Sequence, residues 1–291
     1  MTALRWHQAD EPRAQQTLFD EPAFERQPGR GEYRGLEFLH VRAQRVINEV
    51  QGAPFGFRYT INPYRGCTHA CSYCYARPTH TYLELDADRD FERRIVVKVN
   101  AVSRLRSELD PRRWQGELIA MGTNTDPYQR AEGKYRLTRG IVEVLTEFAN
   151  PFSILTKSTL VLRDVELLAQ AARRTGVRIN LSIGTLDEDV WRATEPGTPH
   201  PLRRVRAVEQ LNEAGIPCGV LVAPVLPGLS DAPDQLEAVA KACVDAGARS
   251  ISTVLLHLRP GVKDVFLSRL AETHPHLVDE WLEDSAEALV S

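Results

Sequence analysis

The chain has 291 residues, of which 43% are hydrophobic and 26% charged, a composition typical of folded globular proteins and not of disordered ones. Its formal net charge of -3 gives no overall attraction for nucleic acid or for an anionic membrane, although a local basic groove would still allow nucleic-acid binding. No run approaches the ~20 apolar residues of a membrane-spanning helix, and the polar start lacks a signal-peptide core. We therefore expect a cytoplasmic protein without membrane contact.

Three regions follow one another along the chain. Residues 1–52 are rich in Gln, Arg, Glu and Pro and predict a loosely ordered N-terminal extension, with one short helix within 38–50. Residues 53–259 alternate β-branched runs with amphipathic stretches, and residues 260–291 predict a helical tail. The predicted strands cover 57–62, 116–123, 152–158, 177–185, 216–226 and 250–258. The predicted helices cover 101–109, 137–149, 162–176, with Asp164 as a candidate cap, 202–215 and 232–247.

This alternation of strands and helices predicts a parallel sheet covered by helices. Either a doubly wound sheet or an incomplete (β/α) barrel fits six strands and five helices. Both architectures gather their chemistry at the carboxyl ends of the strands. Polar segments in those places are therefore the first candidates for a functional site.

Three of the five cysteines, Cys67, Cys71 and Cys74, follow the first predicted strand with the spacing C-x3-C-x2-C. In an intracellular protein, clustered cysteines are more typical of metal sites than of disulfides. Three thiolates can hold three irons of a four-iron cubane and leave the fourth iron free for another ligand. The alternative is a Cys3His zinc site completed by His69 or His80.

The other two cysteines have a different character. Cys218 lies within an apolar predicted strand, and Cys243 falls on the apolar face of a predicted helix with Leu236 and Val239. Both are therefore expected to be small core residues without a metal.

The cysteine motif in its strand and loop context resembles that of radical S-adenosylmethionine (radical SAM) enzymes. The phrases "INPYRGCTHACSYCYAR", "GTNTDPYQ", "ILTKS", "SIGT…EPGTP" and "GVLVAPVLPGLSD" are similar to the spore photoproduct lyase-like branch, the SplB-type DNA repair photolyase homologues, over roughly residues 54–259. The resemblance implies a partial (β/α)6 TIM-type barrel with a 4Fe-4S cluster on the three cysteines. It further implies that the open iron binds SAM and that an electron cleaves SAM to methionine and a 5′-deoxyadenosyl radical. Such an enzyme needs an electron donor such as flavodoxin or ferredoxin.

The resemblance also assigns SAM contacts to residues near the first two strand ends. Tyr73 would pack near the adenine, or alternatively fill the underside of the loop. Thr125 and Asp126 would meet the methionyl ammonium. The alternative for Asp126 is a cap or turn residue before Pro127.

Four further SAM contacts are implied later in the chain. Lys157 would pair with the SAM carboxylate, or alternatively be a solvated lysine. Ser182 would bind the ribose, or alternatively a neighbouring backbone group. Glu195 and Arg204 would reach the cofactor carboxylate, or alternatively pair with each other on the surface.

One departure from the branch concerns the fate of the radical. Spore photoproduct lyases carry a hydrogen-donating cysteine after the second strand, whereas this chain has Thr123 near that position and no cysteine between Cys74 and Cys218. A threonine hydroxyl is a poor hydrogen-atom donor, and nothing in the sequence favours Tyr128 as a substitute. The leading hypothesis is therefore a radical SAM enzyme with an unidentified substrate. The alternatives are a DNA photolesion lyase and a non-catalytic zinc- or cluster-stabilised binding protein.

Overall fold

The large sheet of the computed structural model, which describes residues 24–50, 56–279 and 281–282, has the strand order β11-β10-β9-β8-β7-β4-β3. Its strands are β3 (Ile47–Glu49), β4 (Tyr59–Ile61), β7 (Ile119–Met121), β8 (Phe152–Thr156), β9 (Val177–Ser182), β10 (Cys218–Val225) and β11 (Ile251–Leu255). Strand β3 pairs antiparallel with β4, and the remaining neighbours are parallel. The six parallel strands are the six predicted ones, so that prediction is confirmed.

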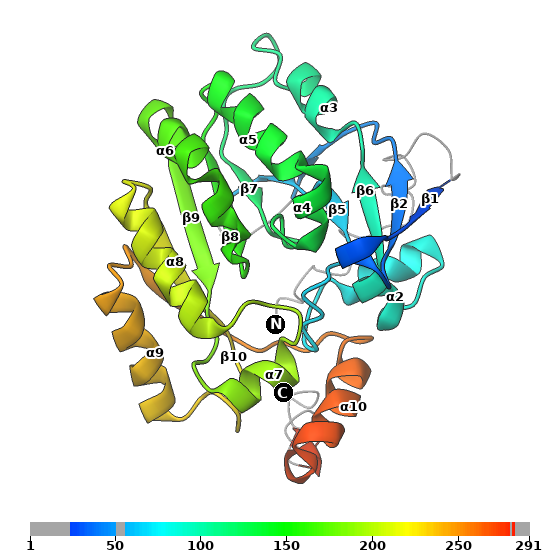
Figure 1. Cartoon of the computed structure of the whole chain (residues 1–291), viewed down its shortest axis with the longest axis vertical. Helices are drawn as coiled ribbons and strands as arrows, with labels where there is room; N and C mark the ends of the chain where they lie inside the picture. Colours follow the sequence, from blue (N-terminus) through cyan, green and yellow to red (C-terminus); the bar gives the residue numbers. More distant parts are fainter. Residues whose placement is uncertain (1–23, 51–55, 280, 283–291) are drawn as a thin grey trace, which may run out of the picture.

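Helices cover one side of this sheet (Figure 1). The longer ones are α3 (Ala101–Glu108), α5 (Leu137–Glu147), α6 (Val165–Arg174), α8 (Pro201–Glu213) and α9 (Pro233–Asp245), as predicted. Their apolar faces and the strands share one large buried core. The parallel strands follow one another across the sheet in chain order, whereas a doubly wound sheet reverses that order. The architecture is therefore the incomplete (β/α) barrel.

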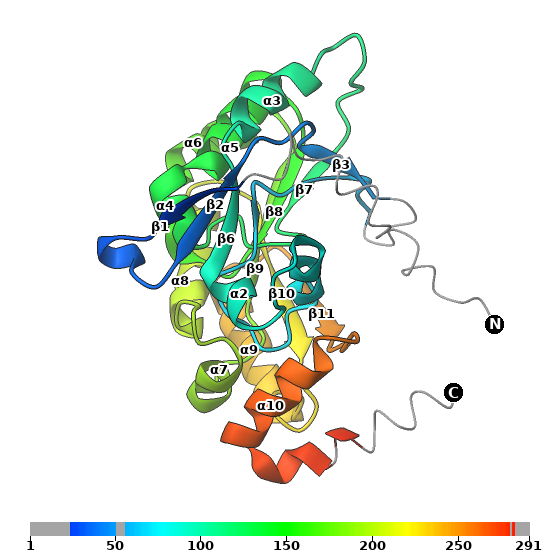
Figure 2. The ribbon, with the colours of Figure 1, turned by 90° about the vertical axis from the view of Figure 1, so that its right-hand side faces the viewer.

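A second sheet of four strands, in the order β1-β2-β6-β5, lies beside the large one (Figure 2). Its strands are β1 (Glu25–Pro28), β2 (Glu37–Val41), β5 (Tyr64–Arg65) and β6 (Arg94–Lys98). The predicted helix within 38–50 is wrong, because this segment forms β2 and β3. Its backbone pairs with β6 and β4, and Phe38 and Leu39 are buried in separate apolar clusters on the two faces of the small sheet. The predicted looseness is likewise wrong for residues 24–50, which form β1, β2 and β3, while residues 1–23 and 51–52 of the predicted extension lie outside the described part.

The remaining helical elements complete the chain. They are α2 (Arg89–Arg93), α4 (Arg130–Tyr135), α7 (Glu188–Thr194), α10 (Lys263–Thr273), and the 3-10 helices η2 (Gly31–Tyr33), η3 (Arg77–Leu83), η4 (Thr159–Asp164) and η5 (Pro275–Leu277). Asp164 lies at the predicted position before α6, but the predicted capping by its side chain is wrong. Helix α6 begins directly after Asp164, but this carboxylate accepts from Arg139 at 2.7 Å and from Arg163, and not from the helix amides. The domain boundaries at 52 and 259 stay a prediction.

Candidate active site

The three cysteines lie on the loop that joins β5 to η3, beyond the carboxyl end of β4. The amide of Cys67 donates to the Phe91 carbonyl at 2.9 Å. Two tight turns follow, in which Ala70 and Cys74 donate to the carbonyls of Cys67 and Cys71. Ala70 takes a left-handed conformation, with φ of 55°, that turns the chain back on itself. These turns bring the three thiols onto one short segment.

Burial favours the protonated form of these thiols. Cys67 and Cys71 are buried, and Cys74 is partly buried. Burial, together with the nearby Glu195 carboxylate, raises the pKa of Cys71 to about 12, and burial also raises the pKa of Cys67 and Cys74. Such thiols become thiolates when a metal replaces the proton. The donor set therefore fits a cluster that brings its own positive charge.

Tyr73, between the second and third cysteines, connects the loop to a buried carboxylate. Its hydroxyl donates a hydrogen bond to Glu195 Oε1. Lys157 Nζ lies 2.8 Å from the same oxygen, and Arg204 Nη2 lies 2.5 Å from Glu195 Oε2. Burial alone would raise the pKa of Glu195, but Arg204 and Lys157 hold it well below its usual range. Two cations thus surround one ionised carboxylate, which leaves one positive charge in excess.

Lys157 and Ser182 meet at the carboxyl ends of β8 and β9. Lys157 Nζ donates to Ser182 Oγ at 2.7 Å and to the Ala223 carbonyl at 3.2 Å. The Ser182 hydroxyl donates to the same carbonyl at 2.8 Å, and Arg204 Nη1 donates to the Ser182 carbonyl at 2.9 Å. The Lys157 ammonium also lies 5.6 Å from the centre of the Tyr73 ring. Five of the seven predicted SAM-contacting side chains therefore form one connected network.

These contacts decide several of the alternatives. Ser182 does satisfy a neighbouring backbone carbonyl, as its alternative predicted. Lys157 is not merely solvated, because its side chain is only 14% exposed and paired. Glu195 and Arg204 do pair, but in the interior and not on the surface. The SAM contacts of these residues stay predictions.

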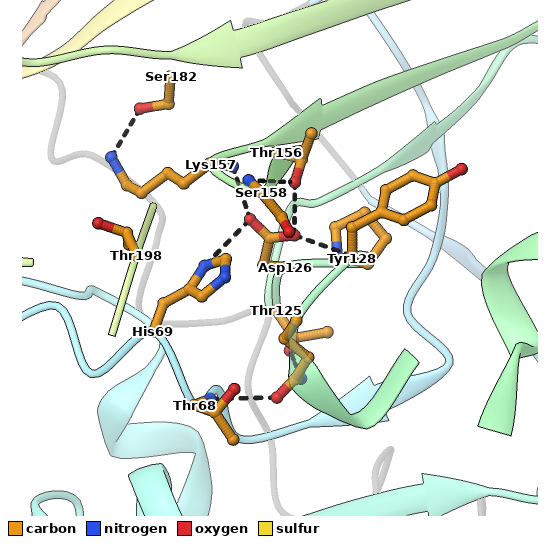
Figure 3. Close-up of polar contacts among 12 residues, drawn as sticks. Thr68, His69, Thr125, Asp126, Tyr128, Thr156, Lys157, Ser158, Ser182 and Thr198 are labelled. Carbon is orange, nitrogen blue, oxygen red and sulfur yellow. Dashed lines mark hydrogen bonds and ion pairs between the residues drawn. The ribbon is translucent and has the colours of Figure 1, made fainter. Parts of the chain in front are cut away.

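Asp126, at the carboxyl end of β7, is surrounded by donors from three segments (Figure 3). Oδ1 accepts from the Thr156 hydroxyl at 2.6 Å and from the Tyr128 amide at 2.8 Å. Oδ2 accepts from the Lys157 amide at 2.7 Å and lies 3.3 Å from His69 Nδ1. Burial alone would raise the pKa of Asp126, but His69 and the hydrogen bonds hold it below its usual value.

The bond to the Tyr128 amide, two residues along, confirms the turn role that was the alternative for Asp126. An ammonium bound here would have to displace one of the four donors, because a carboxylate has about four acceptor positions. The predicted SAM contact stays a prediction. The contact with His69 anchors the cysteine loop to the ends of β7 and β8.

Thr125 faces the first turn of the cysteine loop. Its hydroxyl donates to the Gly66 carbonyl at 2.7 Å and accepts from Gln129 Nε2 at 2.8 Å. Gln129 also donates to Gly66 and accepts from the Thr68 amide at 3.1 Å. The sequence reasoning missed Gln129, because a glutamine without motif spacing carries no signal. Thr125 contact with SAM stays a prediction.

The last residue of α7 and the chain that follows it pack directly against the cysteine loop. The Ser72 amide donates to the Thr194 carbonyl at 2.9 Å, and the Gly197 amide donates to the His69 carbonyl at 3.0 Å. A Cβ atom on Gly197 would lie 2.2 Å from the Thr68 carbonyl oxygen. The close approach of two backbones therefore requires glycine here. The glycine of "EPGTP" was the signal available in the sequence.

Arg77 is a second residue that the sequence reasoning missed. It is fully buried, and it donates to the Cys71 carbonyl from Nε at 3.0 Å and from Nη2 at 2.9 Å. Its guanidinium also pairs with Glu92 at 2.5 Å. Charge-assisted bonds of this kind fix the loop backbone between the second and third cysteines.

The compact zinc alternative finds no support in the described residues. Among them, no three His, Cys, Asp or Glu side chains converge as ligands of one metal ion. His69 contacts Asp126, and His80 Nε2 lies 2.9 Å from the Arg94 carbonyl oxygen. A cubane does not need such convergence, because each thiolate binds a different iron.

The predicted core role of Cys218 and Cys243 is confirmed, since both are fully buried in the large apolar core. Thr123, near the place of the donor cysteine of the lyases, accepts a hydrogen bond from Asn62 Nδ2 at 3.3 Å. Its hydroxyl thus lies at the carboxyl end of β7, on the same strand end as Thr125 and Asp126.

The fold and the site define a partial α/β barrel with a three-cysteine loop at the carboxyl ends of its strands. The chain matches the Radical SAM superfamily over residues 61–243, and it belongs to that superfamily. A protein of Mycobacterium tuberculosis described as uncharacterized is 43% identical over 253 residues, which are 87% of this chain and 74% of that protein. An uncharacterized protein of Methanocaldococcus jannaschii is 33% identical, over 67% of this chain and 70% of that protein.

Solved structures of spore photoproduct lyase share the fold. One variant, with bound AdoMet and dinucleoside spore photoproduct, aligns with a TM-score of 0.58 and 19% identity, over 81% of this chain and 66% of that chain. Another variant, with dinucleoside spore photoproduct, aligns with a TM-score of 0.59 and 21% identity, over 85% and 71%. In the described residues, no helix is both long and apolar enough to cross a bilayer.

Proposed function

We propose that the chain is a radical SAM enzyme in which Cys67, Cys71 and Cys74 hold a 4Fe-4S cluster. The observation that carries the proposal concerns three thiols on one loop, two of them buried and one partly buried. Through Tyr73 and Glu195, this loop is joined to a cationic network at the strand ends. The bound cluster would supply one electron for cleavage of SAM. The superfamily membership supports the same assignment.

The protein's own residues have distinct tasks in this proposal. The excess positive charge of Lys157 and Arg204 over Glu195 suits an anionic group, and the SAM carboxylate is the proposed ligand. The Tyr73 ring offers apolar area for the adenine, and the Ser182 hydroxyl a bond to the ribose. The backbone contacts of the loop hold the three thiols in a fixed arrangement, which orients whatever they bind.

The test is anaerobic reconstitution with iron and sulfide, followed by reduction with SAM present. We expect roughly four irons per chain and formation of 5′-deoxyadenosine. Cys71→Ala should lose both the iron and the formation of 5′-deoxyadenosine. Cys243→Ala is the matched control, because it makes the same substitution in the apolar core, and it should keep both. A wild-type chain that holds one zinc and never cleaves SAM would favour the binding-protein alternative.

The lesion-lyase alternative is favoured by the lyase-like fold and disfavoured by Thr123. The test measures the affinity of the protein for irradiated and for plain DNA at several salt concentrations. Equal affinity for the two DNAs would count against a lesion lyase. The proposed radical SAM function also includes an electron donor, such as flavodoxin or ferredoxin, and a cytoplasmic location.

A further inference from the structure

We propose that helix α10 is a working part of the cluster site, and that Arg269 on it is a positioning residue for the cysteine loop. The inference rests on the proposed function, because the loop matters through the cluster that it holds. Both views place α10 at the end of the molecule where α7 lies (Figures 1 and 2). Helix α10 contacts the loop itself through polar and apolar side chains.

The polar contact is made by one guanidinium. Arg269 Nη1 donates to the Ala70 carbonyl at 3.1 Å, and Nη2 lies 2.5 Å from both Asp88 Oδ1 and Glu92 Oε1. Ala70 is the residue in left-handed conformation between the first and second cysteines. The two acidic residues thus hold the Arg269 guanidinium in place, with one of its nitrogens directed at the loop.

Arg77 repeats this arrangement at the next residue. It donates to the Cys71 carbonyl and shares the Glu92 carboxylate with Arg269. Two successive carbonyls of the cysteine loop are therefore each bound by a guanidinium. One of these arginines comes from the loop's own neighbourhood, and the other comes from the far end of the chain.

The apolar contact comes from the same helix. Phe266 and Leu270 belong to one buried cluster with Cys71 and Tyr73. Positions 266, 269 and 270 share a helix face, since they are spaced by three and four residues. The face of α10 that carries Arg269 therefore also covers the loop with apolar side chains and excludes water there.

Both contacts bear on a cluster held by the loop. Donors and a positive charge near a cluster favour its reduced, more negative state, and low solvent exposure strengthens the effect. Loss of the Arg269 charge should therefore make the cluster potential more negative. Loss of its hydrogen bond should let the loop open and expose the thiols.

The test needs no cluster in its first stage. In cluster-free, reduced protein we would measure alkylation of each cysteine by iodoacetamide with mass spectrometry. Arg269→Met should speed alkylation of Cys71 roughly tenfold, the factor expected for loss of charge-assisted bonds, while Cys243 stays protected. Glu272→Gln, an exposed charge change on α10, should match wild type.

The second stage uses reconstituted protein. We expect Arg269→Met to release iron to a chelator faster than wild type and to lower the midpoint potential of the cluster. Arg269→Lys should restore the midpoint potential more than it restores protection of Cys71 from alkylation. The reason is that an ammonium keeps the positive charge but lacks the forked set of donors of a guanidinium. Wild-type alkylation and potential in Arg269→Met would overturn the inference, as would equal acceleration at Cys243, which signals general unfolding. A wild type that takes up no cluster would defeat the proposed function alone, since alkylation still decides the role of Arg269.

Discussion

The hydroxyl of Tyr73 donates a hydrogen bond to the carboxylate of Glu195, so the cysteine loop and the strand-end cations share one buried anion. Changes at either residue should therefore be felt at the cysteines and at the proposed SAM site together.

Tyr73→Phe removes the hydroxyl and keeps the ring. We expect the free energy of unfolding of the cluster-free protein to fall by about 1 to 2 kcal/mol, because a bond to a charged acceptor is lost while both cations still satisfy Glu195. Urea denaturation measures this loss. Weaker SAM binding by the reconstituted variant, in calorimetry, would place the effect at the proposed site, and unchanged binding would contradict the coupling.

Glu195→Gln removes the anion between two buried cations. We expect a loss of about 3 kcal/mol or more in the free energy of unfolding at neutral pH, because the cations lose their partner in the interior. The pKa of Glu195 is depressed in the folded state, so its stabilisation is present above its ordinary value of 4.5 and is lost as pH falls below it. The wild type should therefore lose more stability than the variant on acidification.

Urea denaturation at a series of pH values from neutral to acid measures how steeply the free energy of unfolding of each protein falls with pH. Asp126 and Asp164 also have depressed pKa values, so the variant should keep part of the acid sensitivity. Parallel curves for wild type and Glu195→Gln would contradict the assignment of an ionised, paired Glu195.

Asp126→Asn distinguishes an anchoring role from a ligand role. The amide cannot accept all four hydrogen bonds, so the cysteine loop loses part of its attachment through His69. We expect iron content and SAM affinity to fall together. A variant with full iron content and weakened SAM binding would instead identify Asp126 as a cofactor ligand, as predicted from the sequence.

Gly197→Ala tests the close packing of two backbones. The added methyl would collide with the carbonyl of Thr68, and overpacking of this kind costs about 1 to 3 kcal/mol. Gly176→Ala is the matched control, because its Cβ would meet only Pro151 at an ordinary 3.6 Å. Thermal unfolding of the two variants should show a lower midpoint for Gly197→Ala, and equal midpoints would refute the contact.

Much of the barrel could be predicted because its strands are runs of β-branched residues separated by amphipathic helices. The small sheet could not, because β6 is a short run that follows the cysteine segment and finds its partners, β2 and β5, through tertiary contacts. The pairing of β2 with β6 and of β3 with β4 likewise gave strands where a helix was predicted within 38–50. Local pattern therefore succeeded where the elements repeat and failed where distant segments pair.

The site shows the same division. The spacing of the three cysteines predicts a metal site directly. A family resemblance was needed to predict four further site residues, Lys157, Ser182, Glu195 and Arg204. Arg77 and Arg269 have no such signal, because an arginine that binds a loop carbonyl has the same local sequence as one on the surface. Asp126 was expected to serve a ligand, but its position before Pro127 already suited the turn that it forms.

The order in which the chain is made has a consequence for the cysteine loop. A ribosome exposes the three cysteines long before it adds Glu195, Gly197 and finally Arg269, and each of these lies against the loop or against Tyr73 within it. A nascent chain thus carries the thiols without the contacts that set their arrangement. If the proposed cluster is inserted into the finished geometry, its insertion follows translation and does not accompany it.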